Sequence, residues 1–240
     1  MIGLGNGIHI AAPPQDFLPS DVSEMQLWLR NGEGVTVEQW DDSSGRNNHA
    51  AQTNASYQAA VTGGGLDFEE GDPDFYTLQQ MITINENQGF CCAWVVQTET
   101  ASSNTLLSDT SVECIQIQNS SKLRIFTNDP SSVTTKLHAT AGSKFGNAKM
   151  LVLLNRTGDG DWSVYKNGVA VAIDPSSGSS ENADSGENVN GFTIDTVGAR
   201  GSVSANYFDG IMYELAFWSK SLSSSEIQSV NDYLTSYHSL

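Results

Sequence analysis

Positive charge is scarce in this sequence, which has 11 lysines and arginines against 28 aspartates and glutamates, for a formal net charge of −17. A surface this acidic repels phosphate backbones and anionic lipid, so nucleic acids and membranes are poor partners. Such a surface keeps a protein soluble in a salty environment and attracts basic surfaces or divalent cations. The charge balance therefore argues against the nucleic-acid-binding and membrane-surface classes.

Cysteine is equally rare, with three residues at Cys91, Cys92 and Cys114. An odd count without C-x-x-C spacing argues against both a disulfide framework and a zinc site. Adjacent residues on a strand point to opposite faces, so we expect Cys91 and Cys92 to face different layers. The sequence thus predicts buried free thiols.

Long hydrophobic runs are absent, and no stretch approaches the roughly 18 apolar residues that a membrane helix needs. Residues 1–14 contain neither the basic region nor the apolar core of a signal peptide. We therefore expect a soluble protein without a cleaved leader.

Glycine and uncharged polar residues take the place of charge: the chain has 22 glycines, 16% charged residues and 38% hydrophobic residues. This composition is typical of many short strands joined by turns. A chain of 240 residues is long enough to bury roughly 70% of its unfolded surface, so it needs no metal or disulfide to fold. We predict an all-β fold, an antiparallel jelly-roll β-sandwich over residues 19–240, preceded by an N-terminal arm over residues 1–18.

The predicted strands are short and closely spaced. They lie at residues 25–30, 35–40, 66–68, 75–78, 81–84, 90–98, 114–118, 122–126, 150–154, 162–165, 169–173, 192–199 and 209–218. The run 90–98 is continuously apolar, which indicates a strand buried on both faces. Apolar and polar residues alternate in 114–118 and 122–126, which predicts that each strand has one face exposed to solvent.

Turns and one helix complete the prediction. Asn167-Gly168 suits a type I′ turn between the strands at 162–165 and 169–173. Residues 174–190 are rich in serine, glycine, asparagine and acids, and predict a long exposed loop. In the last strand the expected common face consists of Tyr213, Leu215 and Phe217.

The end of the chain predicts a short α-helix packed against the sandwich. Ser223 and Glu226 form a capping box, and Leu222 with Ile227 occupies the hydrophobic-staple positions. An apolar stripe follows at Ile227, Val230 and Leu234.

Two stretches resemble the concanavalin A-like lectin/glucanase superfamily, in its laminin-G-like form. The first runs from Leu27-Trp-Leu-Arg through Trp40-Asp-Asp-Ser-Ser-Gly-Arg-Asn-Asn-His-Ala to Gly65-Leu-Asp-Phe. The second comprises Ser163-Val-Tyr-Lys-Asn-Gly-Val and Phe208-Asp-Gly-Ile-Met-Tyr-Glu-Leu. The resemblance implies the jelly-roll sandwich and leaves the function open.

The N-terminal arm is similar in Met1-Ile-Gly-Leu-Gly-Asn-Gly to small virion proteins from tailed phages of marine cyanobacteria, several of which carry this sandwich. That resemblance implies a non-enzymatic capsid decoration or tail-associated protein, assembled in the host cytoplasm. The arm carries four large apolar residues, Ile2, Leu4, Ile8 and Ile10. Because so short a segment cannot bury them on itself, we expect the arm to dock on other virion proteins, which makes the protein oligomeric or assembled on a particle.

Two alternatives remain open: a carbohydrate-binding module for cell-surface glycans, and a glycoside hydrolase. Hydrolases of this fold place acids in the pattern E-x-D-x-x-E on one strand face, and retaining chemistry needs the carboxyl groups about 5 Å apart. The acidic cluster that comes nearest to this pattern, at 69–74, contains Gly71 and Pro73, and we expect it to form a turn. We therefore predict no catalytic residues and no enzyme activity.

The same cluster is the best calcium candidate, with Asp41, Asp42 and Asp209 as rivals. Many relatives bind calcium, but this sequence has no defined ligand motif, so we predict no metal ligand and no cofactor.

The remaining candidates are scattered. No histidine lies beside a Ser or Cys in a catalytic motif; the four are His9, His49, His138 and His238. Exposed tryptophans stack on sugar rings, but all five here lie in apolar strand patterns, so we expect them in the core: Trp28, Trp40, Trp94, Trp162 and Trp218.

Overall fold

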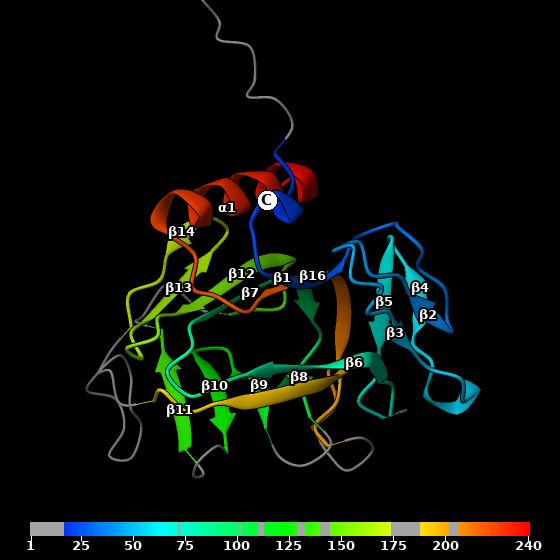
Figure 1. Ribbon diagram of the computed structural model, residues 1–240. Coiled ribbons are helices and arrows are strands. Elements are labelled where there is room, and N and C mark those ends of the chain that lie inside the picture. The colour runs from blue at the N-terminus through cyan, green and yellow to red at the C-terminus, as the bar shows by residue number, and fades with distance from the viewer. Residues whose placement is uncertain are drawn as a thin grey trace, which may run out of the picture.

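The computed structural model describes residues 17–71, 73–100, 102–109, 113–128, 133–139, 145–173, 188–201 and 206–240. Two antiparallel sheets lie face to face, and a C-terminal helix covers the outer surface of one of them (Figure 1). This arrangement confirms the predicted β-sandwich with its short C-terminal helix. The expected arm lies outside the described residues as far as residue 16, including Ile2, Leu4, Ile8 and Ile10.

The helix-side sheet has the strand order β14-β13-β12-β7-β16-β5-β4, with β1 also paired to β16. On one edge of β16 runs β7, while the other edge pairs first with β5 and then with β1. Its strands are β1 (Met25–Leu29), β4 (Ala60–Thr62), β5 (Gly65–Phe68), β7 (Phe90–Thr98), β12 (Met150–Arg156), β13 (Trp162–Lys166), β14 (Val169–Ala170) and β16 (Gly210–Trp218).

The outer sheet has the strand order β11-β10-β9-β8-β15-β6-β3-β2. Its strands are β2 (Gln39–Trp40), β3 (Ala50–Ala51), β6 (Tyr76–Ile84), β8 (Ser102–Ser108), β9 (Cys114–Asn119), β10 (Lys122–Thr127), β11 (Val133–His138) and β15 (Phe192–Val197). The helices are two short 3₁₀ turns, η1 (Pro19–Asp21) and η2 (Ala55–Tyr57), and one α-helix, α1 (Ser224–His238).

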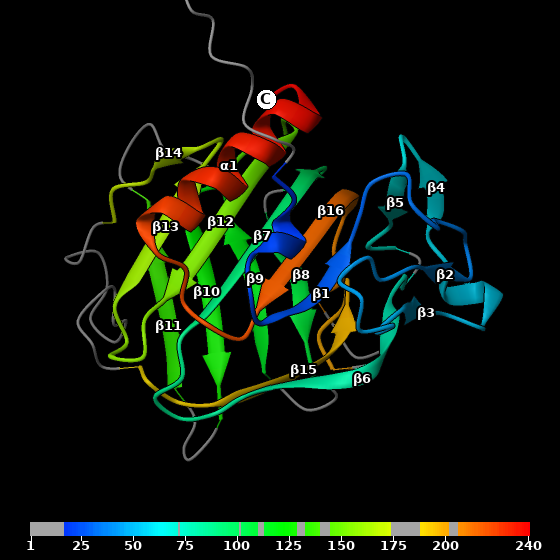
Figure 2. The ribbon, with the colours of Figure 1, turned by 45° about the horizontal axis from the view of Figure 1, so that its top comes forward.

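Two hydrophobic cores separate these layers. The first lies between the sheets, and the second lies between the helix-side sheet and α1, which crosses over β12 and β7 in Figure 2. The strand β7 contributes to both, with Cys92 in the first core and Cys91 in the second. Its predicted burial on both faces is therefore confirmed. All three cysteines are free and buried.

The five tryptophans also lie in these cores. Trp40, Trp94 and Trp162 belong to the first core, and Trp28 and Trp218 to the second. The prediction that they pack inside the protein is confirmed. None of them is exposed enough to stack on a sugar ring.

Two strand predictions for the first half of the chain were wrong. The expected strand at 35–40 is reduced to β2, because a turn with the Thr36 amide bonded to the Gln39 carbonyl occupies its first part. The strands expected at 75–78 and 81–84 form one strand, β6. Its pairing with β15 has a register irregularity between Ile194 and Thr196. The irregularity interrupts the alternation of apolar residues in β6, so the sequence pattern looks like two separate strands.

A second correction concerns β16. Tyr213 was expected to share a face with Leu215 and Phe217, but it packs against the second core while those two lie in the first. The cause is a register shift between Met212 and Glu214 in the pairing with β7, which adds a residue to β16. An extra residue of this kind turns the following side chains to the opposite face.

The predicted hairpin and helix are confirmed. Asn167 and Gly168 both have positive φ, at 48° and 76°, as a type I′ turn requires. Ser223 caps α1, and its capping box with Glu226 is complete. The apolar stripe is buried at Ile227, Val230 and Leu234.

Residues 174–187 of the expected loop lie outside the described residues. Among the described residues, no helix has the length and apolar character needed to span a membrane.

Candidate functional site

The outer sheet has one face in the first core and one polar face. On β9, β10 and β11 the core side chains are Ile115, Ile117, Leu123, Ile125 and Leu137. The positions between them carry polar or half-buried side chains: Gln116, Gln118, Arg124, Phe126, Thr134 and Lys136. The alternation predicted for β10 is therefore confirmed, whereas the exposed face expected for β9 is wrong over most of that strand, because Cys114 and Gln116 are buried. The polar positions together give this sheet a surface of hydrogen-bonding groups.

A hollow of about 510 Å³ opens on this surface, lined by Gln118, Arg124, Thr134 and Lys136. We call it the outer-sheet hollow. Its walls come from three neighbouring strands, β9, β10 and β11. Because each side chain stands on a paired strand, the groups are held in place by the sheet and not by a loop.

Cross-strand registry places Arg124 within a polar row. Its neighbours in register are Gln116 on β9 and Lys136 on β11, and Gln116 in turn lies opposite Thr105 on β8. Gln116 Nε2 donates to Thr105 Oγ1 at 2.8 Å, and Arg124 Nη1 donates to Gln116 Oε1 at 3.4 Å. Gln116 is only 1% exposed, so it forms a fixed support for the guanidinium.

Hydrogen-bonding capacity remains unused around the hollow. Within the described part of the chain, the buried atoms Arg124 Nε and Gln118 Oε1 have no hydrogen-bond partner. Beside them Phe126 is half-buried, with the guanidinium carbons of Arg124 and Arg200 at 5.8 and 5.9 Å from its ring centroid. The site therefore combines cations, an amide, a hydroxyl and one aromatic ring.

The buried carboxylates of the outer sheet serve its backbone. Glu113 accepts hydrogen bonds from the amides of Asn128 and Thr193, and Asp109 accepts one from the Glu113 amide. Glu113 and Asp109 both also accept a bond from the Thr193 hydroxyl. These acids are engaged in holding β15 and the ends of β9 and β10 together.

The described residues of the acidic cluster at 69–74 lie in a turn, as expected, with Glu69 bridged to Pro73. Asp74 Oδ2 accepts a bond from the Glu69 amide at 3.1 Å, and Asp209 Oδ1 accepts one from the Glu70 amide at 3.3 Å. Asp72 lies outside the described residues. The described part of the chain contains no group of three or more His, Cys, Asp or Glu side chains arranged to hold a metal.

The other calcium rivals have structural roles. Asp42 is buried, and its carboxylate accepts bonds from the amides of Trp28, Ser44 and Asn48. Asp41 Oδ1 lies 3.3 Å from His49 Nδ1. Asp42 is thus fully used in shaping its own turn and does not fit a metal-ligand role.

The histidines are dispersed. His49 Nδ1 accepts a bond from the Asp42 amide at 3.1 Å, and His238 is buried beside Glu214. His138 is the last residue of β11, and His9 lies outside the described residues. The structure therefore brings none of the described histidines to the outer-sheet hollow.

The four residues that line the hollow were not singled out from the sequence. The signal that points to them is the alternation at 122–126, which puts Arg124 on a wet face. Alternation does not reveal that β11 is the neighbouring strand, nor the register of the two strands. That pairing places Thr134 and Lys136 beside Arg124.

No protein-family model and no curated protein sequence matches this chain. Among solved structures it is similar to Trypanosoma rangeli sialidase, with 17% identity over 90% of this chain and 33% of the sialidase, at a TM-score of 0.56. It is also similar to the binding domain of botulinum neurotoxin serotype D/C, with 15% identity over 90% of this chain and 53% of that domain, at a TM-score of 0.55. Botulinum neurotoxin type C gives 15% identity, 90% and 52% coverage, and a TM-score of 0.54.

The chain thus spans about a third of the sialidase and about half of the neurotoxin structures. At this identity the likeness shows the fold alone.

Proposed function

We propose that this protein is a non-catalytic glycan-binding β-sandwich, and that the outer-sheet hollow is its binding site. The observation that carries the proposal is the set of donors and acceptors around the hollow, placed by three paired strands. Sugar hydroxyls both donate and accept hydrogen bonds, so they suit the amide of Gln118 and the hydroxyl of Thr134. Polar groups held rigidly on strands fix the orientation of a ligand.

The structural neighbours support a carbohydrate ligand. The sialidase structures include a complex with sialic acid, and botulinum neurotoxin type C is described as depending on two ganglioside molecules to get into cells. A site without catalysis is supported by the lining itself, because none of its four described residues is an aspartate or glutamate. Most glycoside hydrolases use two carboxyl groups that flank the scissile bond.

The glycan-binding proposal is tested by titrating the purified protein with a panel of neutral and acidic cell-surface oligosaccharides. We expect binding that falls when Gln118→Ala and Thr134→Ala are combined. Thr83→Ala is the matched control, because Thr83 is an exposed threonine of the same sheet on β6. If no oligosaccharide binds the wild-type protein, or if the double variant binds as well as wild type, the proposal is wrong.

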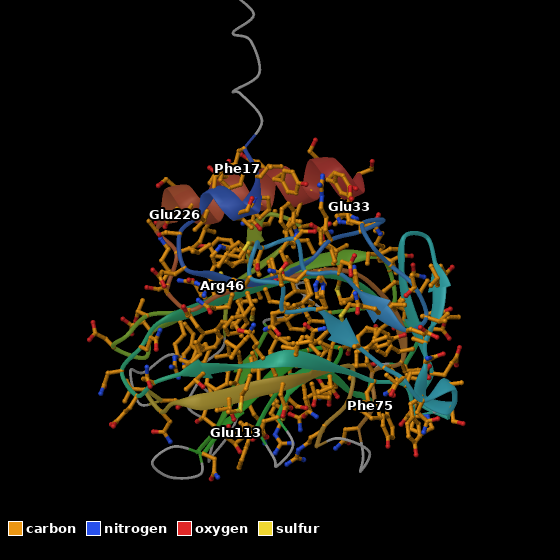
Figure 3. The ribbon with its side chains drawn as sticks, turned by 45° about the vertical axis from the view of Figure 1, so that its right-hand side comes forward. Phe17, Glu33, Arg46, Phe75, Glu113 and Glu226 are labelled. Carbon is orange, nitrogen blue, oxygen red and sulfur yellow. The ribbon has the colours of Figure 1, made fainter. Side chains whose placement is uncertain are left out.

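We also propose that the sandwich is displayed on a phage particle, attached through residues 1–16. Support comes from where the described chain begins: Phe17 and Leu18 pack against the second core, next to α1. Figure 3 shows Phe17 and Glu226 on the helix-covered side and Glu113 on the far side, beside the outer sheet. A partner bound ahead of Phe17 would therefore leave the outer-sheet hollow free.

This display proposal is tested by deleting residues 2–14 and measuring incorporation into purified particles by mass spectrometry. We expect the truncated protein to keep its melting temperature and its glycan binding but to be missing from particles. Normal incorporation of the truncated protein would show that the arm does not attach it.

A further inference from the structure

Arg124 and Lys136 lie directly opposite each other on β10 and β11, on the polar face of the outer sheet. Side chains in such pairs have Cβ atoms about 4.5–5.5 Å apart, and like charges placed there destabilise a sheet. The chain has only 11 basic residues, yet two of them meet in this one hollow. Like charges in this position are unfavourable for the sheet by themselves, and a negatively charged group bound in the hollow would be attracted to both side chains.

Arg124 has donors to spare for such a group. Its single hydrogen bond among the described residues runs from Nη1 to Gln116, and no carboxylate there pairs with it. A guanidinium offers donors in a planar fork that matches two oxygens of a carboxylate or sulfate. The bond to Gln116 engages Nη1 and Nε is buried, so an anion in the hollow would meet the Nη groups at the end of the guanidinium.

A third cation strengthens the local positive potential. Arg200 lies against the ring of Phe126, the same ring that Arg124 contacts. Phe126 is in register with Thr134, one of the residues that line the hollow. Three cationic groups thus gather on one part of a protein whose net charge is −17.

We infer that the outer-sheet hollow selects glycans with an acidic group, a carboxylate or a sulfate ester, which binds between Arg124 and Lys136. This inference rests on the proposed glycan-binding function and names the class of ligand for the same site. Gln118 and Thr134 bind the neighbouring hydroxyl groups of the sugar.

The net charge of the protein limits how densely charged a ligand of the hollow can be. Screening limits the reach of surface charges to about 8–10 Å at ordinary salt, so a single acidic group in the hollow feels mainly the nearby cations. A dense polyanion such as nucleic acid extends beyond the hollow and is repelled by the net charge of −17 that the protein carries. The site therefore favours a sugar with well-separated charges.

The experiment compares matched pairs of oligosaccharides by calorimetry on the full chain. One arm uses a neutral oligosaccharide that ends in a single galacturonate and the methyl ester of that compound, and the other uses an oligosaccharide with a single sulfate ester and its desulfated form. We expect the wild-type protein to bind at least one acidic member about tenfold more tightly than its neutral partner, a difference of about 1.4 kcal/mol. The arm that responds identifies the acidic group as carboxylate or sulfate.

Variants then assign the selectivity to the hollow. Arg124→Gln and Lys136→Gln should each remove most of the preference for the acidic member, measured as the ratio of its dissociation constant to that of the neutral member, while Arg124→Lys should keep part of it. Lys166→Gln is the control, because it removes the same charge from β13 of the helix-side sheet. Melting temperatures within about 2 °C of wild type verify that the variants fold.

The outcomes separate this inference from the proposal beneath it. Equal binding of acidic and neutral members overturns the acidic selectivity but leaves glycan binding standing. Acidic selectivity that survives both Arg124→Gln and Lys136→Gln overturns the assignment to this hollow. Absence of all glycan binding overturns both.

Discussion

His238 Nε2 lies 2.6 Å from Glu214 Oε2, and both side chains are almost completely enclosed, at 2% and 1% exposure. The other carboxylate oxygen of Glu214 accepts a bond from Trp28 Nε1 at 2.7 Å. This buried contact joins the last turn of α1 to β16 and β1. The helix is therefore fastened to the sandwich by a polar contact as well as by its apolar stripe.

His238→Ala should lower the free energy of unfolding by about 3–5 kcal/mol, because it leaves the Glu214 carboxylate buried with one of its partners removed. Denaturant titration followed by tryptophan fluorescence measures this change. Ser236→Ala, at an exposed position of the same turn, should change stability by no more than about 0.5 kcal/mol. A loss below about 1 kcal/mol for His238→Ala would show that the contact does not fasten the helix.

Leu234→Ala should cost about 2–5 kcal/mol, because Leu234 is 1% exposed within the second core and its removal opens a cavity. Thermal or denaturant unfolding measures the loss. An unchanged melting temperature would contradict the packing of α1 on the helix-side sheet.

Ser223→Ala should cost about 1 kcal/mol, because the serine hydroxyl accepts a hydrogen bond from the otherwise unpaired Glu226 amide. Ser223→Asp should keep most of the stability, since aspartate caps a helix equally well. Ser224→Ala, one residue into the helix, is the matched control. If Ser223→Ala and Ser224→Ala unfold alike, the cap contributes nothing to stability.

The stability of the protein should fall as the pH rises through the range in which thiols ionise. Burial raises the pKa of Cys114 from 9.0 to about 11, and it raises the pKa of Cys91 and Cys92 well above 9.0. Below pH 9 the thiols are neutral in both states, whereas between about pH 9 and 11 only the unfolded chain ionises. Proton release then favours unfolding, so denaturant midpoints should decrease from pH 8 to pH 10.

Cys114→Ala should make that decrease less steep, because it removes one of the thiols responsible. Alkylation gives an independent measurement: the native protein should react slowly at pH 8, and the unfolded chain should react at all three thiols. Rapid alkylation of the folded protein at pH 8 would contradict the burial of the thiols.

Incubation with laminarin, agar or carrageenan should release no reducing sugar, because the acidic cluster at 69–74 lies in a turn and offers no acid pair on a strand face. A reducing-end assay over long incubation makes the measurement. Turnover by the wild-type protein that disappears in Glu69→Gln would refute the non-catalytic proposal.

Local sequence patterns were sufficient for much of the fold. Continuous apolar character marked β7 as a doubly buried strand, and Asn167-Gly168 marked the hairpin turn. The capping box at Ser223 and Glu226 located the start of α1. These features depend on neighbours within a few residues along the chain, where the periods of strand and helix act directly on the pattern.

Sequence by itself therefore determined that β7 is buried on both faces, where the 167–168 hairpin turns and where the helix begins. Tertiary structure decided the rest: a register shift in β16 turned Tyr213 to the second core, and pairing of β10 with β11 brought Lys136 opposite Arg124. A strand has the same alternation whatever strand lies beside it, and a slip of one residue exchanges its faces. The outer-sheet hollow arises from register between strands, and this information is contained only in the folded sheet.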